Sequence, residues 1–145
     1  LIMTLAFFSC LFMLRKKNVF YEKIDDLSGL STNHPILSIA LLVVLFSLAG
    51  IPPLAGFFAK FYIFMAVIEQ SMYFLAIVGL LSTVVAAFYY LRLIKIIYFD
   101  KAKQQFERDH NIGLRLTLAI STGILALYFI YPGLLRELVS KIVVI

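Results

Sequence analysis

The sequence predicts an all-α membrane protein: a polytopic helix bundle, one membrane domain over residues 1–145, with one discontinuous transmembrane helix. Of its 145 residues, 63% are hydrophobic and 14% charged, whereas soluble domains carry roughly 25% charged residues. The mean hydropathy is +1.00, and a water-soluble domain of this size would need more charge on its surface. Long uncharged runs, one of them interrupted by prolines and glycines, complete the prediction.

Four apolar runs indicate the membrane spans. The predicted spans are residues 1–14, 35–68, 71–91 and 116–135. The first is shorter than the ~20 residues that a crossing needs, and basic residues follow it rather than precede it. We therefore expect the end of a helix that begins upstream, in a chain that is the C-terminal part of a longer subunit.

The run over residues 35–68 is too long for one straight helix. At 1.5 Å per residue it would extend ~51 Å, against ~30 Å of hydrocarbon. Prolines cannot donate to the preceding helical turn, and glycines allow unusual backbone angles. The sequence therefore predicts a helix break near residues 49–56, at Gly50, Pro52, Pro53 and Gly56. The break is compatible with one discontinuous span or with a hairpin of two short helices.

The distribution of basic residues favours the discontinuous span. Ten lysines and arginines lie in the polar segments 15–34 and 92–115, and two lie in the C-terminal tail. One discontinuous span places both segments on one side, where the positive-inside rule predicts cytoplasmic loops. The C-terminus is then periplasmic, or in the intermembrane space. The net charge of +5 thus reflects topology, and we expect no nucleic-acid partner.

Lys60 is the candidate catalytic residue. It is the only charged residue in the run 35–68, and it lies one helical turn after Gly56. An ionisable residue inside a membrane segment is a functional-site hypothesis by default. A lysine in a low-dielectric environment releases its proton more readily than one in water, which suits proton transfer. The alternative is that its long side chain extends to the membrane interface.

Two hydroxyl residues inside spans, Ser47 and Thr83, are candidates for a water chain. Hydroxyls in membrane helices more often bond to carbonyls of their own helix. One cysteine and two histidines are too few for a zinc finger, and one cysteine excludes an internal disulfide. The sequence contains no phosphate loop or dinucleotide fingerprint. We therefore predict no metal site and no cofactor site on this chain.

Three segments carry a resemblance to a known family. The run FSLAGIPPLAGFFAKFY (residues 46–62) resembles the lysine-bearing broken helix of the antiporter-like subunits of proton-pumping NADH:quinone oxidoreductase, respiratory complex I. The segments DDLSGL (25–30) and AFYYLR (87–92) are similar to that family too. Within it, lysine at position 60 followed by Phe-Tyr resembles the subunit N family, called subunit 2 in mitochondria. The subunit M family typically has glutamate there.

The resemblance implies that Lys60 relays protons, driven by remote quinone reduction. It implies FMN, iron–sulfur clusters and quinone on other subunits and no redox centre on this chain. The implied partners are the other membrane-arm subunits, the N-terminal part of this subunit, the lipid bilayer and protons. The implied location is the bacterial inner membrane or the mitochondrial inner membrane. A cation/proton antiporter subunit of the same superfamily and a structural membrane anchor are the alternatives.

Overall fold

The computed structural model describes residues 1–16, 19–20, 23–52, 54–102, 107–108 and 111–130. In chain order the elements are α1 (Ile2–Met13), β1 (Leu14–Lys16), β2 (Val19–Phe20), the 3-10 helix η1 (Ile24–Leu27), α2 (Leu30–Asn33), α3 (Pro35–Ala49), α4 (Ala55–Glu69), α5 (Tyr73–Phe99), β3 (Glu107–Arg108) and α6 (Ile112–Ile130). Over these residues, α5 is the one helix long and apolar enough to cross a membrane alone, while α1, α3 and α6 are shorter apolar helices.

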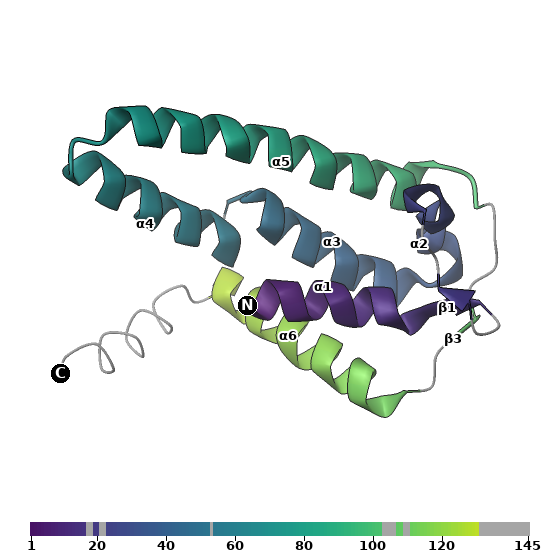
Figure 1. The fold of residues 1–145 in the computed structure, drawn as a ribbon. Helices are drawn as coiled ribbons and strands as arrows, with labels where there is room; N and C mark the ends of the chain where they lie inside the picture. The colour runs from purple at the N-terminus through teal and green to yellow at the C-terminus, as the bar shows by residue number, and fades with distance from the viewer. Residues whose placement is uncertain (17–18, 21–22, 53, 103–106, 109–110, 131–145) are drawn as a thin grey trace.

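The helices form a bundle with α3 at its centre (Figure 1). Helix α3 packs against α1, α5 and α6, and α1 also packs along α6. Helix α4 continues beyond the end of α3 in the same general direction, and α5 returns along both of them (Figure 1). The all-α prediction is confirmed, and the β structure in the described residues is limited to three very short antiparallel strands in the order β2-β1-β3.

The buried core lies between α3 and its neighbours, and the outer faces are apolar. Leu41 and Leu45 of α3 are fully buried, as are Cys10 of α1 and Ile97 of α5. The exposed large hydrophobic side chains on α5 include Phe74, Leu81, Val84, Val85 and Phe88. A bundle that is apolar inside and outside is suited to lipid rather than to water.

Local signals explain the start of α3. Pro35 occupies the first turn of the helix, where its missing amide proton would have no partner in any case. Ser38 donates its hydroxyl proton to the carbonyl oxygen of His34 at 3.0 Å. The predicted span 35–68 is therefore helical from its first residue, and α4 ends at Glu69, one residue past the predicted boundary.

Both helices that flank the predicted loop 92–115 extend into it. Helix α5 continues to Phe99, eight residues beyond the predicted end of its span, and α6 begins at Ile112 rather than at 116. The reason for the first difference is packing: Ile94, Ile96 and Ile97 are buried, so the helix gains more by continuing than by ending at the charged residues. Residues 131–135 of the last predicted span lie outside the described residues.

The predicted loop 15–34 is compact where the structure describes it. It contains β1, β2, η1 and α2, and both η1 and α2 pack against α5. The amide of Gly29 donates to the carbonyl oxygen of Ile96 at 3.3 Å, and Gly29 adopts a left-handed backbone conformation with φ of 68°. This segment therefore covers the last turns of α5 and leads directly into α3.

Candidate functional site

The end of α3 is a Schellman motif. Gly50 has φ of 85°, and its amide donates to the carbonyl oxygens of Phe46 and Ser47 at 3.1 Å each. The amide of Ile51 donates to the same Phe46 oxygen at 3.1 Å. These bonds are the ones that define this helix ending. They leave the carbonyl groups of Leu48 and Ala49 without a backbone donor from the turn.

Lys60 of α4 supplies the donor for these two carbonyl groups. Its ammonium nitrogen donates to the carbonyl oxygen of Leu48 at 2.9 Å and to that of Ala49 at 3.1 Å. The C-terminal end of a helix carries partial negative charge, which stabilises a cation placed there. The half-buried Lys60 side chain therefore points back to the helix break, and its amine is held by the last carbonyl groups of α3.

Gly50 also makes room for the lysine. A Cβ atom on Gly50 would lie 3.1 Å from Cδ of Lys60 and 3.2 Å from its Nζ, which is closer than most real Cβ contacts. Its positive φ is, in addition, a conformation that residues with a Cβ rarely adopt. Glycine at this position thus allows both the left-handed ending of α3 and the close approach of the Lys60 side chain.

Ser47 and Gly56 form the second half of the junction. The amide of Gly56, in the first turn of α4, donates to Oγ of Ser47 at 3.2 Å, and Ser47 donates to Sδ of Met3 in α1 at 3.0 Å. The backbones approach so closely that a Cβ on Gly56 would collide with the Ser47 carbonyl group. Ser47 of α3 therefore caps α4, as Lys60 of α4 caps α3.

Neither Thr83 nor Pro52, the remaining candidates that the structure describes, takes part in these interhelical hydrogen bonds. Thr83 lies on α5, where its hydroxyl donates to the carbonyl oxygen of Leu80, one turn earlier in the same helix, at 2.7 Å. Pro52 is exposed in the turn after α3, and Pro53 lies outside the described residues. The amide of Leu54 donates to the carbonyl oxygen of Ile51 at 3.1 Å and leads the chain into α4.

Three contributors to the junction could not be recognised from residue types. Leu48 and Ala49 take part through backbone carbonyls, which every residue has, and Met3 comes from 44 positions away in the sequence. The one available signal is the left-handed Gly50 ending, which implies carbonyls that still need donors. Over the residues described, no group of three or more His, Cys, Asp or Glu side chains is placed to hold a metal ion.

Similarity to known proteins now identifies the family. The family model described as NADH:quinone oxidoreductase/Mrp antiporter, TM, matches residues 1–86, more than half of the chain. The chain belongs to this antiporter family. The matched region contains α1, the α3–α4 junction and the first half of α5.

Relatives of this antiporter-family chain are subunits of NADH-quinone oxidoreductase. Subunit N of Pelagibacter ubique is 70% identical over all 145 residues, which is 31% of that protein. Subunit N of Methylobacterium nodulans is 48% identical over 133 residues, 92% of this chain and 27% of that protein. The chain thus spans less than a third of the length of these relatives, and it corresponds to their C-terminal part.

The fold is similar to a solved structure as well. Respiratory complex I from Thermus thermophilus with bound aureothin contains a chain that superimposes with a TM-score of 0.77 at 27% sequence identity. The match covers 92% of this chain and 30% of that chain. The family is one of integral membrane subunits, and it includes subunits of respiratory complex I in bacterial membranes.

Proposed function

We propose that this chain is part of a subunit N of NADH:quinone oxidoreductase and that Lys60 is its proton relay. The observation that carries the proposal is the pair of hydrogen bonds from the Lys60 ammonium to the last carbonyls of α3. Open backbone at membrane depth is tolerated where it is buried in protein or lines a wet cavity. A titratable amine at such a break is a suitable acceptor and donor of protons.

The mechanism follows from the charge dependence of these bonds. The ammonium form of Lys60 is stabilised by two carbonyl oxygens at the negative end of α3, whereas the neutral amine loses most of that attraction. A charge that moves nearby changes the balance between the two forms, so the amine takes up a proton in one state and releases it in the other. The driving reaction is quinone reduction on other subunits, and FMN, iron–sulfur clusters and quinone belong to those subunits.

The remaining parts of the proposal concern partners and orientation. The partners are the other membrane-arm subunits, the N-terminal part of the same subunit, the surrounding lipid and the translocated protons. The segments 15–34 and 92–115 face the cytoplasm, because the basic residues concentrate in these two segments. The turn between α4 and α5 faces the periplasm. The C-terminus then lies on the periplasmic side.

The experiment uses the complete complex in inverted membrane vesicles, with NADH oxidation and proton uptake measured together. Lys60→Ala is expected to lower both rates severely while the complex still assembles. Lys60→Arg is expected to lower them too, because arginine keeps its proton. Lys95→Ala is the matched control: Lys95 is exposed on α5, and its loss should leave both rates near the wild-type values. Near-normal pumping by an assembled Lys60→Ala complex would refute the relay.

A cation/proton antiporter subunit is the second candidate, because the matching family model includes Mrp antiporters. The two functions differ in what drives the proton. Proton movement that requires NADH supports the first, and proton movement that follows an imposed Na⁺ gradient without NADH supports the second. A purely structural anchor has no need of a broken helix with a lysine at the break, since open backbone in lipid costs several kcal/mol per unsatisfied group.

A further inference from the structure

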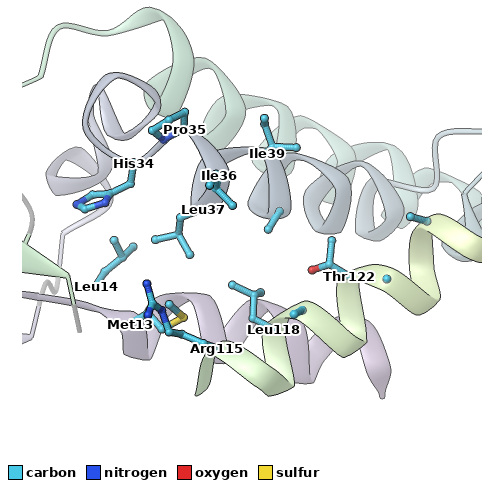
Figure 2. A pocket seen from close by; sticks show the side chains of 14 residues that line it. Met13, Leu14, His34, Pro35, Ile36, Leu37, Ile39, Arg115, Leu118 and Thr122 are labelled. Carbon is cyan, nitrogen blue, oxygen red and sulfur yellow. The ribbon is translucent and has the colours of Figure 1, made fainter. Parts of the chain in front are cut away.

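A second feature, away from the helix break, is a cavity of ≈ 520 Å³ between α1, α3 and α6 (Figure 2). Its volume falls within the range of about 300–1,000 Å³ that is typical of ligand pockets. Nothing in the proposed proton path uses it, because Lys60 and its two carbonyl partners do not line it.

The cavity is a slot along α6. Its lining on that helix runs from Arg115 to Ala126, a length of ~16 Å at 1.5 Å per residue. Small residues leave the space open: Ala119, Gly123 and Ala126 line it on α6, and Ala40 lines it on α3. A Cβ on Gly123 would meet no atom within 4 Å. The length of the slot along α6 is therefore close to the thickness of the hydrocarbon layer of one leaflet, which is half of ~30 Å.

The two ends of the slot differ in charge. Among the described residues that line it, Arg115 is the one that is always charged, and it lies with Met13, Leu14 and His34 at one end (Figure 2). The structure gives the exposed Arg115 guanidinium no ion pair with any described residue. The rest of the lining is almost wholly apolar. A ligand that fits has an anionic head and a long apolar tail.

We infer that the slot binds one anionic phospholipid, with its phosphate on Arg115 and one acyl chain along α6. The orientation agrees with the topology, because Arg115 belongs to the basic segment that the sequence places on the cytoplasmic side, and anionic lipids concentrate in that leaflet. A guanidinium is suited to phosphate, which it can bind through two parallel hydrogen bonds. Basic pockets between membrane helices on that side are known to bind anionic head groups.

The test labels the purified complete complex with phosphatidylglycerol that carries a photoreactive group in its acyl chain. Parallel labelling with the matching phosphatidylcholine measures the contribution of the head-group charge. In the wild type we expect phosphatidylglycerol to label the peptide around residues 119–126 more strongly than phosphatidylcholine does. Arg115→Ala should reduce that labelling about fivefold, the effect of one basic residue near the membrane surface.

Two further variants keep the result interpretable. Arg92→Ala removes a basic residue that does not line the slot, and it should leave the labelling unchanged. Gly123→Leu fills the slot, with open space for the new side chain, and it should reduce labelling by both lipids. Equal labelling of Arg115→Ala and Arg92→Ala would overturn the proposal. So would equal labelling by the two lipids in the wild type, or a protein segment of the complex crosslinked at Ala119 in place of lipid.

Discussion

Lys60 reaches back across the helix break to Ala49, and its ammonium donates a hydrogen bond of 3.1 Å to the carbonyl oxygen of the last residue of α3. The two residues are 11 positions apart and belong to different helices. Ser47 makes the opposite connection, since its Oγ accepts the amide proton of Gly56 in α4. The two half-helices thus cap each other, and substitutions at either connection should affect both.

Gly50→Ala is expected to destabilise the break and to displace the lysine. The left-handed backbone at Gly50 costs a residue with a Cβ about 1–2 kcal/mol, and the new methyl group would press on Cδ and Nζ of Lys60. The expected result is a lower thermal midpoint of the purified complex and slower proton pumping.

Gly50→Asn is the matched control, because asparagine tolerates the left-handed conformation better than alanine does. It should recover part of the stability while still crowding the lysine. If Gly50→Ala has the stability and pumping rate of the wild type, the position described for the Lys60 side chain beside Gly50 is incorrect.

Gly56→Ala should separate the end of α3 from the start of α4. A Cβ at this position collides with backbone atoms of Ser47, which cannot move aside as a flexible side chain would. We expect reduced assembly of the complex on native gels, or loss of a disulfide crosslink engineered across the break. Gly113→Ala is the control, since the nearest neighbour there is the side chain of Asn111, and it should assemble normally.

Ser47→Ala should weaken the junction by about 1 kcal/mol. The change removes the acceptor for the Gly56 amide and the donor to Sδ of Met3, and interhelical hydrogen bonds in membranes average somewhat below that value each. Thermal unfolding of the purified complex measures the effect. Ser82→Ala provides the comparison, because the Ser82 hydroxyl donates to the carbonyl oxygen of Gly79 in its own helix. Equal midpoints for the two variants would contradict the interhelical role of Ser47.

Cysteine labelling tests the orientation. Lys101 follows α5 on the side predicted to be cytoplasmic, and Ser71 lies in the turn between α4 and α5; both are exposed. In a background without other reactive cysteines, Lys101→Cys should react with an impermeant maleimide only in inverted vesicles. Ser71→Cys should react only from the periplasmic side. The reverse pattern would indicate an inverted topology or a hairpin at the break, and labelling of both from one side would mean that α5 does not cross the membrane.

The helix break and its lysine could be foreseen because they depend on residue types with a strong backbone or charge preference. Gly50 and the prolines exclude a regular helix, and a single lysine in a long apolar run stands out. The partners of that lysine could not be foreseen, since Leu48 and Ala49 take part through carbonyl oxygens. Which carbonyls remain free depends on the three-dimensional ending of α3.

The end of α5 could not be foreseen from the sequence. The uncharged run ends at Leu91, before Arg92 and Lys95, yet α5 continues to Phe99. Both charged side chains are exposed, while Ile96 and Ile97 are buried. A hydropathy run detects where lipid-facing sequence ends, whereas helix length here is set by packing against α2 and η1.

The equal lengths of α3 and α4 have an electrical consequence. Each helix has 15 residues, or ~22 Å at 1.5 Å per residue, so the junction lies midway along the pair. A full crossing of the membrane potential is worth about 2.3 kcal/mol per elementary charge at 100 mV. A proton bound at Lys60 would have crossed about half of that drop, so occupancy of this position should respond to membrane voltage by about 1 kcal/mol per 100 mV.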